Sequence, residues 1–549
     1  MEANVTELWQ IVEALQVEVG SMQTDMDSLW LMLGAILVVF MQAGFTMLEV
    51  GSVGAKHTKN LLIKNLLDLA VAAVMWWAVG WGLAFGTATE ENGFNQFFGP
   101  GSFFARGEEF EDEAGNYGTK NGYSWALWLF QWSFSGTAVT IVSGAVGERI
   151  CMSGYFLFSQ AMVGLIYPLV SFFLQRRLEI KSSFTPPPHR SRPPIQVHAT
   201  GGMAALVMVV LIGPRLGRFS DGGAKNKMER QSVIIETLGA FILWVGWYGF
   251  NGCSTLYITG SSHVAAKAMV CTSIAAASAA LGVACTSLIL FQHVGPGQVI
   301  NGLLSGLVAI TAGCAVVEVE GAFLIGTIAA LNYLGCSRLL ELVRIDDMVD
   351  ASPVHLANGV WGMIAAGLFA SKEGYSASYY SERGSLCCGL LYGCGPRQLM
   401  ANMVFVLSVL VWVGLTTLAI CHGVKYMGIL RISNVVERTG TDSAAHGGSD
   451  MPEFAKNLLS RIEALAAKAG HADTLEGGES CVPSGVHSMA RSMAPSIASD
   501  RSCTPEMQLT AFRGRLKNDV LKESMGLGRC NNAWMCDRER EARRTQPNV

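Results

Sequence analysis

The sequence predicts an all-α polytopic membrane protein with about eleven transmembrane helices. Half of the 549 residues are hydrophobic and only 15% are charged, whereas about 25% of the residues of a soluble domain are charged. Apolar runs long enough to cross about 30 Å of hydrocarbon recur between residues 28 and 424, separated by short polar stretches. The formal net charge of −4 gives no basic excess that would favour a nucleic-acid partner.

The predicted spans follow one another along the chain, and each ends where an apolar run meets polar residues. They cover residues 29–50, 64–87, 123–147, 155–174, 197–213, 231–252, 266–290, 298–317, 321–342, 354–370 and 399–424. Together they form one membrane domain, residues 28–430. The first twenty residues are acidic and amphipathic, unlike a cleaved signal peptide, so the first span is expected to serve as the targeting signal.

The charges of the connecting loops predict the orientation of the chain. Basic residues gather in the loops after the first, fifth and ninth spans, among them Lys56, Arg215 and Arg344, whereas the charged residues within 88–122 are mostly acidic. Basic loops stay on the cytoplasmic side of a membrane. We therefore expect a multi-pass protein with its N-terminus outside and its C-terminus in the cytoplasm.

Residues 1–27 form a predicted extracellular amphipathic segment before the first span. Its apolar side chains are spaced alternately four and three residues apart, which is the seam of a short coiled coil. They are Leu8, Val12, Leu15, Val19, Met22 and Met26. Two interpretations stay open: the segment joins copies of the chain, or it is a helix that lies on the membrane or on the protein itself.

Two histidines inside the membrane domain are the first candidates for a functional site, because ionisable side chains in lipid are costly unless they are paired or face a cavity. His198 begins the fifth span and His355 the tenth, and each opens a His-x-x-x-Gly element. Because five spans is an odd number, two equivalent five-helix halves would run in opposite directions, as an inverted repeat followed by one further helix. Inverted repeats put substrate sites near the membrane midplane, where the two imidazoles can meet. The alternative is that each histidine only bonds a carbonyl in a helix contact.

Adjacent neutral imidazoles can share a proton and offer an acceptor to a small N–H donor. The other polar groups have plainer interpretations. Asp346, Asp347 and Asp350 precede His355 and are expected to cap its helix or to pair with basic residues. The aromatic clusters near residues 130–134 and 247–252 are typical of packing. The cysteines lack metal-ligand spacing, so we expect no metal or cofactor, and we expect a protein that is not an enzyme.

Five motifs in order resemble the signatures of the ammonium transporter family, over residues 28–450. They are FMQAGFTMLE at 40–49, KNLLD at 64–68, SGAVGER at 143–149, GLLSGLVAITAGC at 302–314 and IDDMVDASPVH at 345–355. Their details look most like the plant and microbial-eukaryote ammonium transporters rather than the Rhesus glycoproteins. The resemblance implies a homotrimer in the plasma membrane, in which each subunit has its own narrow hydrophobic pore through the lipid bilayer.

The resemblance also implies roles for six residues in the passage of ammonium or ammonia, with methylammonium as a further candidate substrate. They are the twin histidines His198 and His355, the gate Phe134 and Phe250, and Phe130 and Ser254 of the external recruiting site. In the family picture, aromatic faces and a hydroxyl hold ammonium, which is deprotonated and crosses as ammonia. A dry pore penalises hydrated potassium or sodium ions, which cannot shed their charge.

Residues 174–196 depart from the family pattern. The family has a Trp of the recruiting site in this region and an Asp just ahead of the first pore histidine, and neither is present. The stretch carries five Lys or Arg residues in what would be a short outside loop, against the predicted orientation. It is either a lineage-specific loop, which would leave the recruiting site incomplete, or the product of a mispredicted exon or a retained intron.

Residues 431–549 form a predicted cytoplasmic regulatory or disordered tail, because their composition is polar and rich in Ser, Gly and Arg. Its start resembles the regulatory segment of the family, with Ala444 where relatives carry a phosphorylatable Thr. The tail keeps a second function open, an ammonium sensor that retains the fold and signals through its tail. A third interpretation, a CO₂ or water channel, would lack the aromatic recruiting site.

Overall fold

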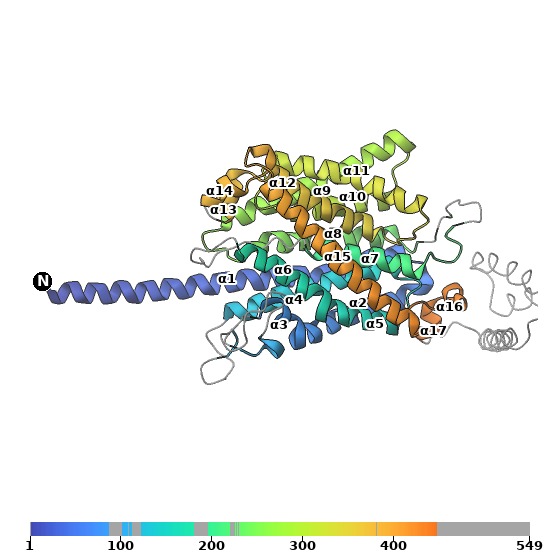
Figure 1. Ribbon diagram of the computed structural model, residues 1–549, viewed down its shortest axis with the longest axis horizontal. Coiled ribbons are helices and arrows are strands. Elements are labelled where there is room, and N and C mark those ends of the chain that lie inside the picture. The colour runs from blue at the N-terminus through green and yellow to red at the C-terminus, as the bar shows by residue number, and fades with distance from the viewer. Residues whose placement is uncertain are drawn as a thin grey trace, which may run out of the picture. The chain divides into compact units, whose positions relative to one another are not determined.

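Helices make up nearly all of the described structure (Figure 1). The computed structural model describes residues 2–86, 101–107, 109–111, 122–180, 196–219, 226, 228, 230–379 and 381–446. Within these residues the only strand-like pairs are two isolated bridges, Ile150 with Arg431 and Val317 with Ala370. The predicted all-α class is therefore confirmed.

Each predicted span coincides with one helix or with a run of consecutive helices. The long elements are α1 (Glu2–Ser52), α2 (Thr58–Met75), η2 (Trp76–Gly80), α3 (Trp81–Phe85), α4 (Gly122–Val146), α5 (Met152–Ala161), η4 (Met162–Ile166), α6 (Tyr167–Ile180), α7 (Gln196–Ile212), α8 (Val233–Gly252), α9 (Ser262–Phe291), α10 (Pro296–Thr311), α11 (Val319–Leu342), η6 (Ser352–Ala357), α12 (Asn358–Phe369) and α15 (Arg397–Tyr426). Short turns join them: η1 (Ala55–His57), η3 (Phe103–Ala105), η5 (Cys253–Thr255), α13 (Lys372–Ser378), α14 (Ser381–Cys387), η7 (Leu390–Tyr392), α16 (Asn434–Thr439) and α17 (Thr441–Ala445). In the described part of the chain, seven helical stretches are long and apolar enough to cross a membrane by length and composition alone.

Small residues let α1 and α8 pack closely along their lengths. A Cβ on Gly239 would lie 2.5 Å from the backbone nitrogen of Leu48, and one on Gly246 would lie 2.9 Å from the carbonyl oxygen of Leu37. Gly44 approaches α8 from the other side, since its Cβ would lie 3.0 Å from the Gly239 oxygen. Helices in lipid associate through such close backbone contacts. This packing fixes α8, which carries the aromatic residues of the site described below.

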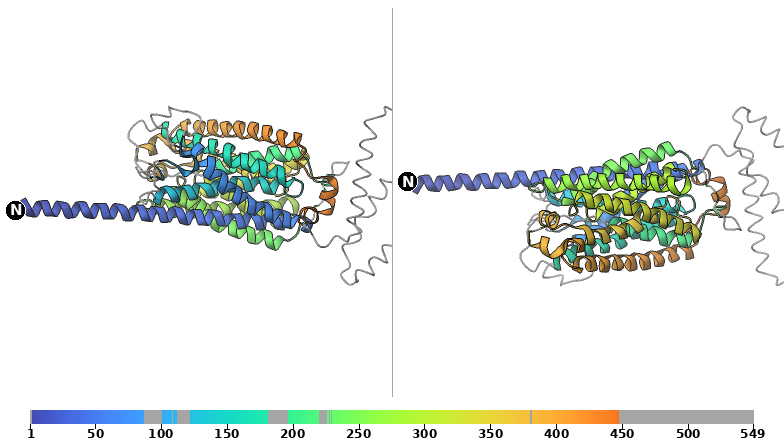
Figure 2. Two further views of the ribbon diagram at one scale, coloured as in Figure 1. Left: turned by 90° about the horizontal axis from the view of Figure 1, so that it is seen from below. Right: turned by 90° about the horizontal axis from the view of Figure 1, so that it is seen from above.

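The first half of α1 extends well beyond the other helices (Figures 1 and 2). Asp27 marks the point where α1 joins them, because the N–H groups of Ile258 and Thr259 donate to its Oδ1 at 2.8 and 2.9 Å. Before that point the seam side chains are exposed apart from the half-buried Val12, and the exposed fraction is 61% for Leu8 and 54% for Leu15. The segment therefore continues the membrane helix as a straight arm and does not lie against the other described helices.

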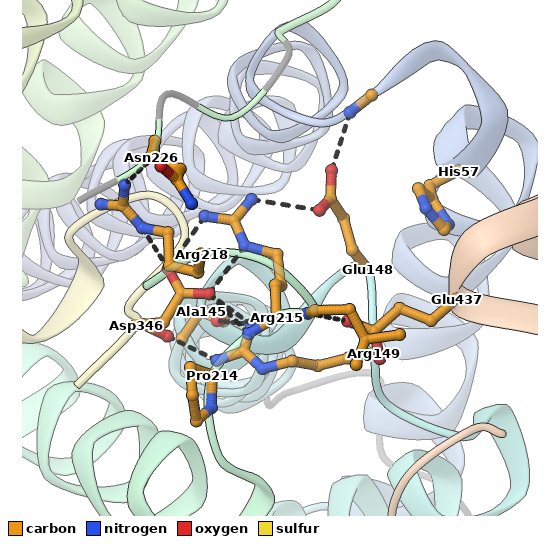
Figure 3. Close-up of polar contacts among 12 residues, drawn as sticks. His57, Ala145, Glu148, Arg149, Pro214, Arg215, Arg218, Asn226, Asp346 and Glu437 are labelled. Atoms are coloured by element: carbon orange, nitrogen blue, oxygen red, sulfur yellow. Dashed lines mark hydrogen bonds and ion pairs between the residues drawn. The ribbon is translucent and has the colours of Figure 1, made fainter. Parts of the chain in front are cut away.

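A buried group of arginines around Asp346 holds the connection that leads to His355 (Figure 3). Arg215 donates from Nε to Asp346 Oδ2 at 2.8 Å and from Nη2 to Oδ1 at 2.9 Å, and Arg218 Nε reaches Oδ1 at 3.1 Å. Arg149 donates to the carbonyl oxygen of Asp346. Burial opposes ionisation, yet the hydrogen bonds and charge of Arg215 hold the pKa of Asp346 well below its ordinary value. The carboxylate is therefore ionised and paired.

The other two acids before His355 take different roles. Asp347 caps the turn that follows, since its carboxylate accepts the N–H groups of Ala351 and Ser352 at 2.9 and 2.7 Å. Asp350 accepts from the hydroxyl of Tyr333 at 2.9 Å. Both predicted roles for these acids, pairing with arginine and capping a helix, are thus confirmed, each for a different residue.

The start of the tail packs against the same end of the helices through α16 and α17. Asp442 accepts the N–H groups of Lys59 and Asn60 at 2.9 Å each, so a residue of the tail caps the first turn of α2. Arg431 pairs with Glu437 at 2.9 Å. The first residues of the predicted tail are thereby tied to the membrane domain.

Two regions singled out from the sequence lie partly or wholly outside the described residues. Of the atypical stretch 174–196, α6 covers the beginning and α7 starts at Gln196, while residues 181–195 are not described. The tail beyond residue 446 is not described either. In the loop before α15, Cys388 and Cys394 form a disulfide.

Removing the Asp346 carboxylate tests the importance of the arginine group. We expect Asp346→Ala to lower the free energy of unfolding by about 3–5 kcal/mol, because it leaves buried guanidinium groups without their partner. The matched control is Arg338→Ala, since Arg338 is exposed and its pair with Glu341 at 3.1 Å is worth less than about 1 kcal/mol. Thermal unfolding of the purified protein measures both. Equal shifts of the two unfolding midpoints would contradict the expectation.

Candidate functional site

Two glycines bring together the segments that carry the predicted pore histidines. His198 lies in the first turn of α7, and His355 lies in the π-helical turn η6. A Cβ on Gly202 would lie 2.9 Å from the carbonyl carbon of His355 and 2.4 Å from the next backbone nitrogen, so no side chain fits there. Gly359 faces Ala199 more loosely, at 3.4 Å. The glycine of each His-x-x-x-Gly element therefore lies against the other element.

The π-helical turn at His355 begins beside a proline. Pro353 has no N–H group and lies in the first turn, where a helix tolerates proline. Its carbonyl oxygen accepts Nδ2 of Asn358 at 3.1 Å, and Asn332 donates to the Oδ1 of that same amide at 3.1 Å. Such wide turns are frequent at functional sites. Here the turn directs His355 towards α7.

The imidazoles of His198 and His355 are in direct contact. Their Nδ1 atoms lie 3.2 Å apart, and the ring centroids are separated by 5.3 Å with planes inclined by 19°. His198 is fully buried and His355 is 5% exposed. One Nδ1 must carry a hydrogen and the other must accept it, so the pair holds a shared proton between the two rings.

Aromatic rings form a column that ends on His198. Trp247 stacks on the imidazole at 5.1 Å with an interplanar angle of 11°, and Phe250 lies at 5.2 Å. Phe134 meets Phe250 edge-on, with centroids 4.6 Å apart, and Phe130 lies 4.6 Å beyond Phe134. The structure thus brings both predicted gate residues into contact with each other and joins them to one predicted recruiting residue and one predicted pore histidine.

The remaining nitrogen of His198 lies within this aromatic surrounding. Its Nε2 is buried and has no hydrogen-bond partner among the described residues. A buried polar atom without a partner costs free energy, and aromatic faces attract N–H groups and cations. A small N–H donor that entered the column would satisfy this nitrogen.

Ser254, the other predicted recruiting residue, lies in η5 just after α8. Its hydroxyl donates to the carbonyl oxygen of Phe250 at 2.6 Å. Gly34 of α1 approaches this region, because its Cβ would lie 2.5 Å from Cβ of Cys253 and 2.8 Å from the ring of Phe130. The segment that contains Ser254 and the Phe130 ring therefore meet at the same part of α1.

Two side chains at the site were not predicted as functional. The sequence favours packing for Trp247, and its position one helical turn before Phe250 is the signal that points to the site. Glu49 lines a small cavity beside His355 and was noted only as the end of a motif. In the part of the chain that is described, no three His, Cys, Asp or Glu side chains come together to hold a metal ion.

The fold and the site define an all-helical, multi-pass membrane protein with a buried aromatic path that ends on a histidine pair. The pattern of the Ammonium Transporter Family matches residues 29–451, which is most of the chain. The chain belongs to the ammonium transporter family.

Relatives from distant organisms agree with this membership. The chain is 33% identical over 441 residues to ammonium transporter 3 of Dictyostelium discoideum. The matched region covers 78% of this chain and 95% of the relative. It is 34% identical over 440 residues to ammonium transporter 1 member 3 of Oryza sativa subsp. japonica, and the matched region covers 77% of this chain and 85% of that relative. These relatives indicate a transporter rather than an enzyme.

Solved structures share the fold. A sensor Amt protein matches with a TM-score of 0.67 at 26% identity, and the match covers 78% of this chain and 100% of that protein. Candida albicans Mep2 matches with a TM-score of 0.64 at 23% identity, covering 74% of this chain and 86% of Mep2.

Because Gly202 has less space around its Cα than Gly359, alanine should have different effects at the two positions. We expect Gly202→Ala to push α7 away from η6 and to lower the free energy of unfolding by about 1–3 kcal/mol. The separation of the imidazoles should lower methylammonium uptake by up to about 100-fold. Gly359→Ala is the matched control, because its added methyl would make an ordinary contact. Uptake by membrane vesicles that hold equal amounts of each variant is the measurement. If both variants lose uptake equally, the glycines do not act through this contact.

Proposed function

We propose that this protein carries ammonium or ammonia across a membrane through a pore lined by His198 and His355. The observation that carries the proposal is the contact of the two Nδ1 atoms at 3.2 Å, at the end of a buried column of aromatic rings. Membership of the ammonium transporter family supports the choice of substrate. Methylammonium, a larger ammonium ion with the same N–H chemistry, is a further candidate substrate.

Ammonium is recruited at the outer end of the column. The ring face of Phe130 attracts the cation, and the hydroxyl of Ser254 accepts one of its N–H groups. Passage beyond Phe134 and Phe250 requires a neutral molecule, because these rings are almost fully buried and offer no polar replacement for a hydration shell. Ammonium can give up a proton and pass as ammonia, whereas hydrated potassium cannot.

The histidine pair can relay the proton that ammonium gives up. When His198 holds the shared hydrogen on Nδ1, its Nε2 is a free acceptor and His355 carries its own hydrogen on Nε2. A proton that arrives at the first Nε2 lets the shared hydrogen move across to His355, which then releases its Nε2 hydrogen. One proton enters and one leaves, and neither ring keeps a full charge.

Replacing either histidine tests the pore assignment. We expect His198→Ala and His355→Ala each to abolish methylammonium uptake or its selectivity against potassium, because a lone imidazole cannot pass a proton onwards. Growth rescue of cells that lack ammonium uptake, together with labelled methylammonium uptake, measures this. A further version, with residues 174–196 restored to the family pattern, separates a defect of that stretch from a defect of the pore. Unchanged uptake and selectivity in both alanine variants would refute the assignment.

A second candidate function is ammonium sensing, favoured by the similarity to a sensor Amt protein at 26% identity. A sensor would keep the recruiting site and pass its signal through the tail, whose start is tied to α2 by Asp442. Failure of the chain and of its restored version to rescue growth, with ammonium binding retained, would favour sensing.

We further propose that the protein is a homotrimer in the plasma membrane, with its N-terminus outside and its C-terminus in the cytoplasm, and that the arm of α1 helps to join its subunits. Every copy enters the membrane in the same direction, so the arms run parallel and in register. The a positions are Val5, Val12 and Val19, and the d positions are Leu8, Leu15 and Met22. The same seam continues along the exposed face of the membrane part of α1, at Leu29, Leu33, Ile36 and Phe40.

The charges beside the seam permit this contact. Glu18 and Asp25 occupy g positions, where they would face e positions of the next helix. The e positions hold Trp9, Gln16, Gln23 and, at the end, Trp30, so no acidic pair meets. The arms can therefore associate without repulsion between like charges.

Cysteine cross-linking tests the joining of the arms. The first 150 residues contain no cysteine, so Leu15→Cys introduces a single thiol at the seam of the arm. We expect it to form covalently linked subunits under mild oxidation in membranes. Val17→Cys lies on the opposite face of the helix and is the matched control, with the same background cysteines. Equal linking by both variants, or none by Leu15→Cys, would exclude the parallel contact.

A further inference from the structure

A small cavity separates His355 from a buried carboxylate. The cavity has a volume of about 10 Å³, which is room for about one water molecule. Its polar lining comes from Glu49, Thr140, Asn301 and His355, and its apolar lining includes Leu304. Of all its lining residues, only Glu49 and His355 can exchange a proton near neutral pH.

In each of these two side chains, one polar atom forms no hydrogen bond with the described residues. Nδ1 of His355 is engaged with His198, and its Nε2 has no partner among the described residues. Oε2 of Glu49 accepts from Nδ2 of Asn65 at 3.0 Å and from the hydroxyl of Ser143 at 2.9 Å. Oε1 of Glu49 has no such partner in the described part of the chain. One oxygen is thus fixed to neighbouring helices, which leaves the other for the cavity.

The buried group formed by Glu49 and its charged neighbours has a net charge that one added proton would neutralise. Lys64 is fully buried, donates to the carbonyl oxygen of Ser143 at 2.9 Å and lies over the ring of Tyr155 at 4.9 Å. Asp68, also buried, accepts the hydroxyl of Tyr155 at 2.6 Å. Two carboxylates and one ammonium group sum to a charge of −1. A single proton on Glu49 makes this buried group neutral, and neutrality lowers the cost of keeping ionisable groups in the membrane.

The other polar residues of the cavity cannot take this role. Thr140 already donates its hydroxyl hydrogen to Gln42 at 2.6 Å. Asn301 donates from Nδ2 to the carbonyl oxygen of Val349 at 3.2 Å, and an amide does not hold an extra proton near neutral pH. The proton therefore has one acceptor within the cavity lining.

We infer that Glu49 receives the proton that leaves His355 and is the last side chain to hold that proton before it passes to water. This inference rests on the proposed transport of ammonium. In the step, the Nε2–H bond of His355 breaks and a water in the cavity takes that proton. The water gives another of its protons to Oε1 of Glu49, where an O–H bond forms. The water is regenerated, His355 becomes neutral, and Glu49 later releases the proton to water at the end of the helices that carries the basic loops.

The test compares charge movement with ammonia movement in vesicles that contain the purified full-length protein. Current after an ammonium pulse reports the proton path, and accumulation of isotope-labelled ammonium nitrogen inside the vesicles reports entry of ammonia. We expect Glu49→Gln to lower the current by about 100-fold, because the amide keeps the shape of the side chain but cannot accept the proton. Ammonia entry should fall with the current, because ammonium cannot give up its proton when the proton path is blocked; an unchanged thermal unfolding midpoint shows that the variant is folded.

Two further variants complete the test. Glu49→Asp keeps a carboxylate and should retain a measurable part of the current. Glu236→Gln is the matched control, because Glu236 is equally buried but bonds Ser52 at 3.0 Å and Arg230 at 3.1 Å and does not line the cavity. It should keep the full current.

The outcomes separate this inference from the proposed function. Full current in Glu49→Gln beside a conducting wild type would overturn the inference alone. So would ammonia entry without any current in the wild type, since no proton would then cross. A wild type that moves neither charge nor ammonia would overturn the proposed function and this inference with it.

Discussion

The site depends on how closely α7 approaches η6. At Gly202 there is no room for even a methyl group, and the backbone beside His355 fills the space. The 3.2 Å contact of the two imidazoles follows from that approach. Because a packed interior does not deform smoothly, the surrounding structure must hold both segments: Asp346 and its arginines fix the start of η6, and Trp247 supports the ring of His198.

Much of the fold could be predicted from the sequence, because burial in lipid imposes long apolar runs that are visible without a partner. The positions of the spans therefore agreed with the helices. Where a helix ends was harder to predict, since α1 runs through Asp27 without a proline or a break. The arginines around Asp346 could not be assigned to it, because Arg149 and the neighbouring Arg215 and Arg218 lie far from Asp346 in the sequence and only the fold brings them together.

The histidines could be found from sequence because an imidazole is unusual in a membrane helix and because the same short element occurs twice. Glu49 and Trp247 could not, for different reasons. A tryptophan in a membrane helix is ordinary, so its stacking on His198 becomes visible only in three dimensions. The partners of Glu49 are Asn65 and Ser143 on two other helices, and nothing in the local sequence around the carboxylate points to them.

The straight arm of α1 also sets a distance outside the membrane. From Asp27 to the start of the helix at Glu2 the arm would reach about 38 Å, at 1.5 Å per residue. Any structure that comes nearer than that to the face from which the arm extends would press against the arm. Gly20 has no neighbouring atom within 4 Å of the position its Cβ would occupy and is the one glycine of the arm, so bending under such a load would begin there. The arm would then act as a spacer that holds such a structure away from that face of the helices.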